Sequence, residues 1–555
     1  MQVRKLGDDL SVAPQIAVAD IAALAAQGYR SLICNRPDGE GADQPLYEEI
    51  ARAAEAAGLK PVYLPIESGK VDDAAAQRFG ELLCELPKPV FAYCRTGTRS
   101  ATLWALAQVQ RRPLPEILDI ARVAGYDLAA VARRIANGGR TPVDRVDARH
   151  QIVIIGGGAA GIATAASLLS RDAKLDIAII DPADVHYYQP GWTLVGAGVF
   201  KPSHTARTMA SLIPRGVHWI KAAVAAFEPR ANAVVLDGCR VVGYDQLVIC
   251  PGLKLNWAGI EGLDETLGRN GVTSNYRYDL APYTWDLVQK LREGRALFTQ
   301  PPMPIKCAGA PQKAMYLSCD HWRREGVLAK IEPEFYNAGG VLFGVADYVP
   351  ALMHYVERYG IDLNFGHTLV KVDGARRIAS FARNRTDGTR ETVEREFDFL
   401  HVVPPQVAPD FLRVSPFADA AGWVDVDPAS LRHRQFGNVH ALGDCTNTSN
   451  AKTAAAARKQ APVVAHNVLA ALGRARTEAR YDGYGSCPLT VERGKIVLAE
   501  FTYGGKLAPS FPSWLLDGRK PTRAAWWLKE RVLPPLYWQA MLKGREWMAQ
   551  PELAD

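Results

Sequence analysis

The chain has 555 residues, of which 48% are hydrophobic and 22% are charged. This composition is typical of folded protein, and the length is too great for one core, so we expect two or three domains. The net charge of +6 is spread along the chain without a basic stripe. These features argue against a disordered chain and against a nucleic-acid-binding protein.

The N-terminal residues and the cysteines indicate where the protein works. MQVRKLGDDL has no apolar core and no cleavage site, so we expect no signal peptide and a reducing, cytoplasmic location. The nine cysteines are scattered and form no CxxC pair, so we expect no metal site. No run of about 18 apolar residues occurs, so we also expect no membrane-spanning helix.

Residues 1–137 are expected to form a small α/β domain, because segments with helical and strand patterns alternate there. Residues 113–137 predict two further helices, and glycine, proline and charged residues at 138–149 indicate a linker. The helices and strands expected before them are residues 19–29, 31–35, 47–58 and 88–94.

The segment KPVFAYCRTGTRSATLWALA (88–107) predicts a strand, a loop that opens with Cys94, and a helix. Loop amides at a helix N-terminus bind anions and lower the pKa of a cysteine. The loop resembles the Cys-x-x-Gly-x-Arg-Ser loop of rhodanese sulfurtransferases and is one residue shorter than that of tyrosine phosphatases. The smaller cradle suits one sulfur atom better than a phosphate, so we expect a persulfide on Cys94, with Arg95 and Arg99 holding an anionic partner. A phosphatase and an inert domain are the alternatives.

A second domain begins near residue 150, where QIVIIGGGAAGIATAASLLS predicts a buried strand, a glycine turn and a helix. Gly156, Gly158 and Gly161 would let backbone amides reach a pyrophosphate at the helix N-terminus. Asp181 ends the next strand about 20 residues later, where a ribose-binding carboxylate is expected. These features indicate a dinucleotide site, and a glycine turn without ligand is the alternative.

Two later segments, YDQLVICPG (244–252) and NVHALGDCTN (438–447), resemble the flavin-binding turns of the flavin disulfide reductase superfamily. The resemblance implies FAD as the cofactor, with Gly252 and Gly443 in tight turns and Asp444 on the ribityl chain. A helix N-cap is the alternative role for Asp444.

One dinucleotide motif is missing from the middle of the chain. Superfamily members that use NAD(P)H usually carry a second GxGxxG there, but residues 295–320 contain prolines and Cys307 instead. We therefore expect no nicotinamide, which disfavours a flavin NADH:quinone dehydrogenase as the rival function.

Four long segments resemble sulfide:quinone oxidoreductases, above all their mitochondrial-type subgroup. The resemblance covers residues 150–548 and implies a glutathione-reductase-like pair of Rossmann domains at 150–505 that oxidises sulfide and reduces quinone. A persulfide sensor or scaffold with a vestigial flavin is a rival outside catalysis, which the intact flavin motifs disfavour. The four segments are residues 186–198, 304–318, 440–462 and 487–505.

The resemblance also implies a redox-active cysteine pair, Cys307 and Cys445, next to the flavin. Sulfide would attack the bridged pair, Cys445 would carry the persulfide and Cys307 would face the flavin, so a lowered thiol pKa is expected. Lys452 is assigned to cofactor binding by the same resemblance. We expect Cys34, Cys84, Cys239, Cys319 and Cys487 to be structural. We also favour packing for Cys250, with a role near the flavin as the alternative, because it replaces a small residue there.

Residues 506–555 combine tryptophans with lysines and arginines, as is typical of a helix lying in a membrane interface. We expect peripheral contact with the inner face of the cell membrane and access for quinone, with Phe501 and Tyr503 as candidate quinone contacts. A packed helix or a dimer surface is the alternative. The apolar candidates are Trp526, Trp527, Leu528, Leu536, Tyr537, Met541 and Leu542, with Lys529 among the surrounding basic residues.

Residues 3–30 and YLPIESGKVDDAAAQRF (63–79) resemble the beta-lactamase-hydrolase-like family, whose fold is related to dual-specificity phosphatases. We therefore expect an α/β chain in which a phosphatase-like domain with a rhodanese-type loop precedes the flavin domains. Fusion would raise the effective concentration of Cys94 near the Cys445 persulfide. A small thiol such as glutathione is the expected acceptor or shuttle, and we allow for a homodimer.

Overall fold

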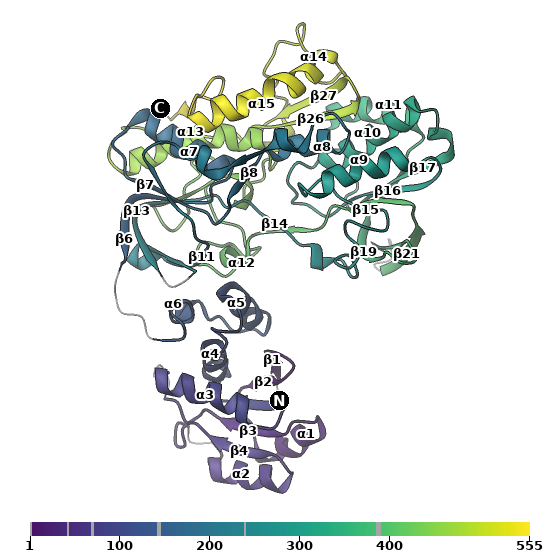
Figure 1. Cartoon of the computed structure of the whole chain (residues 1–555). Helices are drawn as coiled ribbons and strands as arrows, with labels where there is room; N and C mark the ends of the chain where they lie inside the picture. The colour runs from purple at the N-terminus through teal and green to yellow at the C-terminus, as the bar shows by residue number, and fades with distance from the viewer. Residues whose placement is uncertain are drawn as a thin grey trace. The chain divides into compact units, whose positions relative to one another are not determined.

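The structure is a computed structural model that describes residues 3–41, 44–67, 71–140, 146–237, 240–384 and 390–554. Cys239 and part of the predicted linker at 138–149 lie outside these residues. The chain divides into two compact units (Figure 1), and the predicted domain bounds stay a prediction. Unit 1 comprises residues 1–150, 222–244 and 410–421, and unit 2 comprises residues 151–221, 245–409 and 422–555.

Unit 1 contains a five-stranded sheet with the order β1-β2-β5-β3-β4. β1 and β2 pair antiparallel, and the other pairs are parallel. The central strand β5 (Val90–Tyr93) is buried along its whole length, as its continuous apolar sequence predicts. The other strands are β1 (Arg4–Lys5), β2 (Leu10–Ala13), β3 (Ser31–Cys34) and β4 (Lys60–Tyr63).

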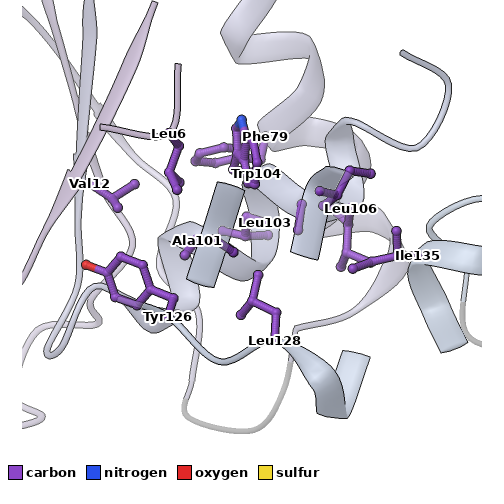
Figure 2. Close-up of a cluster of buried hydrophobic side chains, with 14 of the residues drawn as sticks. Leu6, Val12, Phe79, Ala101, Leu103, Trp104, Leu106, Tyr126, Leu128 and Ile135 are labelled. Carbon is purple, nitrogen blue, oxygen red and sulfur yellow. The ribbon is translucent and has the colours of Figure 1, made fainter. Parts of the chain in front are cut away.

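Helices cover both faces of this sheet because successive strand residues point to opposite sides. Phe91 joins a cluster with Leu24 and Ile50 on one face. Ala92 joins a larger cluster on the other, which contains Phe79 and Trp104 (Figure 2). The helices are α1 (Ile21–Ala26), α2 (Tyr47–Ala56), α3 (Asp73–Glu85), α4 (Thr98–Ala107), α5 (Leu114–Val123) and α6 (Ala132–Ala136), of which α5 and α6 confirm the two helices expected at 113–137.

The first sheet of unit 2 contains the neighbouring strands β10-β7-β6-β13, and β24 also pairs with β13. The loop after β6 leads into α7 (Ala159–Arg171), which packs against α13 (Ala454–Ala471) (Figure 1). This strand–turn–helix arrangement is typical of a Rossmann domain and confirms the predicted one. The strands are β6 (Ala148–Ile155), β7 (Ile177–Ile180), β10 (Val217–Ile220), β13 (Val241–Ile249) and β24 (Val439–Ala441).

A second parallel sheet of unit 2 has the order β15-β22-β16-β17-β18. Helix α10 (Ala310–Arg324) packs on it and also on a hairpin of β26 (Gly485–Glu492) and β27 (Lys495–Phe501). Both sheets support the α/β fold class expected from the sequence. The strands are β15 (Val272–Thr273), β16 (Gly294–Gln300), β17 (Ile331–Asn337), β18 (Asp362–Phe365) and β22 (Phe399–His401), and further helices are α9 (Leu280–Lys290) and α11 (Val349–Tyr359).

The C-terminal part of unit 2 is helical, as predicted, but irregular. It starts with α14 (Arg523–Trp527), where Thr522 Oγ1 accepts a hydrogen bond from the Ala525 amide at 3.2 Å. Two π-helical turns, Leu528–Val532 and Leu536–Ala540, flank α15 (Leu533–Pro535). Prolines lack an N–H group, so Pro534 and Pro535 interrupt the regular α-helical hydrogen bonds at this point.

Candidate functional site

The loop between β6 and α7 is shaped by glycines that cannot carry a side chain. An ideal Cβ on Gly156, whose φ is +106°, would lie 2.6 Å from the Cys250 carbonyl oxygen. On Gly161 it would lie 1.9 Å from the Gly156 oxygen. Gly158 caps α7 and has open space on its Cβ side. The loop therefore presents a helix N-terminus at an accessible point, which fits the pyrophosphate of a dinucleotide.

Asp181 follows β7 and is fixed beside this loop. One carboxylate oxygen accepts a hydrogen bond from the Gly157 amide at 2.6 Å, and the other accepts one from the Ala183 amide at 2.8 Å. The carboxylate thus lies next to the glycine turn, where a ribose would be bound. Its role in ribose binding stays a prediction.

Gly443 and Asp444 come close to the same loop from β24. Gly443 has φ +77°, and an ideal Cβ there would lie 3.5 Å from Ala160 in the first turn of α7. Asp444 is half-buried. Burial raises the pKa of this carboxyl group, while the positive charges of Lys452 and Lys306 oppose the shift. The turn and carboxylate fit the flavin side of FAD, with Gly252, at φ +79°, in a second open turn.

Lys452 lies near this carboxylate but has contacts of its own. Its ammonium group donates a hydrogen bond to the Thr446 carbonyl at 2.7 Å and lies 4.8 Å from the centroid of the Trp423 ring. The Lys452 carbonyl accepts a hydrogen bond from the Cys307 amide at 2.8 Å. The backbone of Lys452 thus connects the Asp444 loop to Cys307, and a direct contact with the cofactor stays a prediction.

Cys307 lies against another thiol that sequence analysis assigned to packing. Its Sγ is 3.5 Å from Sγ of Cys487, which β26 carries. Lys313, on α10, donates a hydrogen bond from Nζ to Cys307 Sγ at 3.1 Å. Cys487, which was expected to be structural, therefore lies in contact with the predicted redox-active Cys307. Cys487 is the first residue of the quoted segment 487–505, which was the available signal.

The backbone around Cys307 brings the two sulfur atoms together. Cys307 has φ +50°, and its carbonyl accepts a hydrogen bond from Ala310 N at 2.7 Å, at the start of α10. Gly309 lies between Cys307 and Ala310 in the sequence, and an ideal Cβ on it would be 2.6 Å from Cys487 Sγ. Glycine at 309 is thus required for β26 to approach this turn. The N-terminus of α10 also favours negative charge on Cys307.

Hydrogen bonding, burial and nearby charge give the Cys307 and Cys487 thiols unequal pKa values. A hydrogen bond from Cys487 and the positive charge of Lys313 lower the pKa of Cys307 well below its ordinary value. The same hydrogen bond, together with burial, raises the pKa of Cys487. In the reduced pair, negative charge is therefore favoured on Cys307 and the proton on Cys487. The expected lowering of a thiol pKa agrees with Cys307.

Lys529 completes this cluster from the C-terminal segment. Its side chain is 4% exposed, and burial lowers its pKa to about 7, with the charge of Lys313 acting in the same direction and those of Cys307 and Cys487 opposing it. Lys529 was expected among the basic residues that surround the apolar candidates of this segment, and its side chain is instead buried. We define the sulfur cluster as Cys307, Cys487, Lys313 and Lys529.

Cys445 has a different environment from the one expected. Its Sγ donates hydrogen bonds to the Ile249 and Leu442 carbonyls, both at 3.4 Å, and the backbone of Gly252 also contacts it. Burial raises its pKa to about 12. Among the described residues, the thiol in contact with Cys307 is Cys487, so the predicted pairing with Cys445 has no contact to support it.

The apolar residues expected at the membrane are partly buried in unit 2. Tyr537, Met541 and Leu542 are all buried, and the Tyr537 hydroxyl lies 2.6 Å from Nε2 of His186. Their assignment to a lipid-facing helix surface was therefore wrong. Among the described residues of this segment, the large exposed apolar side chains are instead Leu507, Trp514, Leu515, Trp527, Trp547, Met548 and Leu553.

The Cys94 loop forms a separate candidate site in unit 1. It runs from the end of β5 to α4, as predicted, and Cys94 is fully buried at its base. The Gly97 amide donates a hydrogen bond to Cys94 Sγ at 3.1 Å. Arg99 is buried and donates to Glu40 Oε2 at 2.7 Å, whereas Arg95 is exposed. The loop can therefore stabilise negative charge on a sulfur atom.

Glu40 holds two arginines near this loop and was missed by sequence analysis. Its Oε2 accepts hydrogen bonds from Arg99 at 2.7 Å and from Arg36 Nε at 2.9 Å. These two arginines lower the pKa of its carboxyl group, against an opposing effect of burial. Glu40 thereby fixes the orientation of the Arg99 side chain. It lies in a loop with no periodic pattern, so no sequence signal marked it.

Comparison with known proteins adds relatives for both units. A family model described as "Pyridine nucleotide-disulphide oxidoreductase" matches residues 150–286, and one described as "Beta-lactamase hydrolase-like protein, phosphatase-like domain" matches residues 2–111. Mitochondrial sulfide:quinone oxidoreductase of Dictyostelium discoideum is 40% identical over 398 residues, which cover 71% of this chain and 86% of the relative.

Two further matches are more restricted: one covers only the N-terminal part of the chain, and the other has low sequence identity. The beta-lactamase hydrolase-like protein of Agrobacterium fabrum is 35% identical over 135 residues, which cover 24% of this chain and 31% of that protein. The X-ray structure of the Aquifex aeolicus sulfide:quinone oxidoreductase matches with a TM-score of 0.61 at 19% identity, covering 73% of this chain and 97% of that one. That last match concerns the fold alone.

The glycine loop, Asp181 and the Gly443–Asp444 turn fit the flavin nucleotide that these relatives imply, so FAD is the cofactor, as predicted. A phosphatase-like domain precedes the flavin-binding part. The chain is an oxidoreductase and belongs to the sulfide:quinone oxidoreductase family.

Proposed function

We propose that the protein oxidises sulfide to sulfane sulfur at Cys307 and Cys487 and passes the electrons through FAD to quinone. The main support is the 3.5 Å separation of the two sulfur atoms. A disulfide bond is about 2.05 Å long, so a movement of about 1.5 Å would join them. This pairing takes the place of the expected pair of Cys307 and Cys445.

The direction of attack follows from the unequal thiol pKa values. The sulfur with the lower pKa is the better leaving group, so hydrosulfide attacks Cys487 and releases the Cys307 thiolate. Lys313, at 3.1 Å, stabilises that thiolate. Cys487 then carries the outer sulfur as a persulfide, in the role that the sequence assigned to Cys445.

The remaining steps return the pair to its starting state. An acceptor thiolate takes the outer sulfur and becomes a persulfide itself, which leaves Cys307 and Cys487 both reduced. FAD supplies the two-electron acceptor that allows the disulfide to re-form, and quinone removes those electrons. The net reaction converts sulfide, a thiol and quinone into a persulfide and a quinol.

An anaerobic sulfide titration of the purified protein tests this proposal. We expect sulfide to bleach the flavin absorbance of the wild type and of Cys445→Ala, but not of Cys307→Ala or Cys487→Ala. Cys84→Ala, at an exposed thiol of unit 1, is the control. Bleaching that survives in Cys487→Ala and is lost in Cys445→Ala would restore the original pairing. Bleaching by NADH would instead favour the NADH:quinone dehydrogenase.

We infer that unit 1 transfers sulfane sulfur through Cys94. Cys94 is fully buried under a loop that places four residues between it and Arg99, which leaves little room for a phosphate with its oxygens. One sulfur atom added to Cys94 needs less room than a phosphate. A persulfide donor would load Cys94, and a small thiol such as glutathione would accept the sulfur.

Cys94→Ser in the full chain tests the role of unit 1. Because serine cannot carry the sulfur, we expect turnover of thiosulfate or glutathione persulfide to fall at least a hundredfold, to a level set by other thiols. Sulfide-dependent flavin bleaching should not change. Unchanged sulfur transfer in this variant would contradict the inference, and turnover of p-nitrophenyl phosphate that depends on Cys94 would favour a phosphatase.

We also propose peripheral contact with a membrane, which would give quinone access from lipid. Trp514 is 84% exposed and Trp527 is 62% exposed, near the exposed basic residues Arg519, Lys520 and Arg523. Exposed tryptophan beside basic residues suits an anionic lipid surface. None of the helices in the described residues could span a lipid bilayer. The inner face of the cell membrane and a homodimer stay predictions.

A further inference from the structure

Tyr126 of unit 1 has a buried hydroxyl group that the proposed function has not used. The side chain is 5% exposed, and among the described residues its oxygen has no hydrogen-bond partner. Buried hydroxyl groups nearly always have a partner, because burial otherwise removes their water contacts without compensation. Figure 2 shows the ring in the apolar cluster, with the oxygen pointing away from Leu103 and Leu128.

The unpartnered oxygen faces the Cys94 loop. An ideal Cβ on Gly97 would lie 2.0 Å from Tyr126 Oη, so the phenol occupies the space that a side chain at 97 would need. Gly97 is also the residue whose amide contacts Cys94 Sγ, at 3.1 Å. Burial raises the pKa of Tyr126, the charge of Arg4 opposes this shift, and the charge of Cys94 adds to it, which agrees with the phenol and the thiol sharing one site.

The position of the phenol is fixed from two directions. Arg4 donates a hydrogen bond to the Ala124 carbonyl at 2.6 Å, and its guanidinium lies 5.2 Å from the centroid of the Tyr126 ring. On the other side, Gly97 has φ +87° and caps α4, so the loop cannot shift without losing this turn. The hydroxyl is therefore held beside the loop in the absence of a ligand.

We propose that Tyr126 donates a hydrogen bond to the outer sulfur of a Cys94 persulfide, which makes it a catalytic residue of unit 1. This inference rests on the proposed sulfur transfer through Cys94. The inner sulfur already has the Gly97 amide as a donor, and Arg99 beside it. The unpartnered phenol is a further neighbouring donor, available for a second atom. A persulfide anion carries its negative charge on that outer sulfur.

The transfer needs no external oxidant. The Cys94 thiolate attacks the outer sulfur of a donor persulfide, so a new sulfur–sulfur bond forms on Cys94 while the old one breaks and the donor leaves as a thiolate. An acceptor thiolate then attacks the same outer sulfur and releases Cys94 as a thiolate. Tyr126 stabilises the anionic persulfide between the two steps.

Tyr126→Phe in the full chain tests the proposal, because it removes the oxygen and keeps the ring. We expect kcat/KM for sulfur transfer to fall at least tenfold, while the thermal midpoint stays the same or rises. The rate at which iodoacetamide alkylates Cys94 should not change, because alkylation involves the inner sulfur alone. Tyr29→Phe is the control. The Tyr29 hydroxyl donates a hydrogen bond of 2.8 Å to Ser11 Oγ, at a place away from the Cys94 loop.

The outcomes separate this inference from the function on which it rests. Unchanged transfer in Tyr126→Phe, with Cys94→Ser inactive, would overturn the role of Tyr126 and leave the sulfur-transfer function standing. Alkylation that falls in parallel with transfer would also overturn it, because the phenol would then act on the thiolate. Transfer that persists in Cys94→Ser would overturn the function itself, and the inference with it.

Discussion

The two thiols of the sulfur cluster titrate as a pair rather than as separate groups. Negative charge is favoured on Cys307 because the hydrogen bond with Cys487 and the Lys313 ammonium group, 3.1 Å away, lower its pKa. A free cysteine is mostly protonated at neutral pH, and these neighbours shift Cys307 toward the thiolate. The reactive sulfur of the reduced site is therefore selected by its neighbours, and burial alone would have given the opposite result.

Lys529 allows this selection to be measured. Its pKa of about 7 means that its charge is present below neutral pH and is lost above it, and that charge helps to lower the pKa of Cys307. Lys529→Met should therefore raise the pKa of Cys307. We expect alkylation of Cys307 at pH 6 to slow by about threefold to tenfold, with the rise in the pH–rate profile moved to higher pH.

The control for this variant is Lys520→Met, at an exposed position of the same segment. Burial disfavours the ammonium form of Lys529, so the folded protein pays a penalty for the charge below pH 7, and Lys529→Met should not lower the free energy of unfolding there. An alkylation profile identical to that of the wild type would show that Lys529 does not act on Cys307.

At the scale of elements, the contact between α10 and β26 brings the two sulfur atoms together. Gly309→Ala would introduce a Cβ 2.3 Å from Leu489 and 2.6 Å from Cys487 Sγ. We expect a loss of about 1–3 kcal/mol in the free energy of unfolding, measured with urea, because the hairpin must move away. Diamide should then oxidise the pair more slowly, as followed by thiol counting.

Gly340→Ala is the matched control for Gly309→Ala, because a Cβ there meets nothing within 4 Å. It should change neither stability nor thiol oxidation. If Gly309→Ala behaved in the same way, the close approach of β26 would not be what positions Cys487.

The C-terminal segment makes a second prediction at this scale. Because Trp514 and Trp527 are two of its large exposed aromatic side chains and lie close in sequence to Arg519, Lys520 and Arg523, the double variant Trp514→Ala/Trp527→Ala should bind anionic vesicles at least fivefold more weakly. Co-sedimentation with vesicles containing phosphatidylglycerol measures this. Leu46→Ala, at an exposed apolar residue of unit 1, should have no effect. Equal binding by the double variant would argue against lipid contact through these side chains.

Local features of this chain could be predicted, and contacts between distant segments could not. The strand, glycine loop and helix at 151–170 form one continuous sequence with a known steric logic, and the structure has them where expected. Cys487 meets Cys307 because β26 packs on α10, which no periodicity within either segment specifies. The quoted segments contained Gly309 and Cys487, but not the information that they touch.

At the scale of the whole molecule, the sequence also did not predict which apolar residues lie on the surface and which lie in the interior. The composition of residues 506–555 indicated an interfacial helix, yet Tyr537, Met541 and Leu542 complete the interior of unit 2. An amphipathic pattern reports that one face is apolar and does not report what covers it. In unit 1, the buried phenol of Tyr126 follows α5 in a short loop, so only its position beside Gly97 makes it a candidate.

The burial of Lys529 changes how damage to the end of the chain should be interpreted. A protease cut or a premature stop codon after about residue 520 would remove the ammonium group from beside Cys307 as well as Trp527 from the surface. A truncated enzyme that fails to turn over would therefore not prove that it had merely lost its anchor. The tail supplies one member of the sulfur cluster, so a detergent-solubilised quinone should not restore what had been cut away.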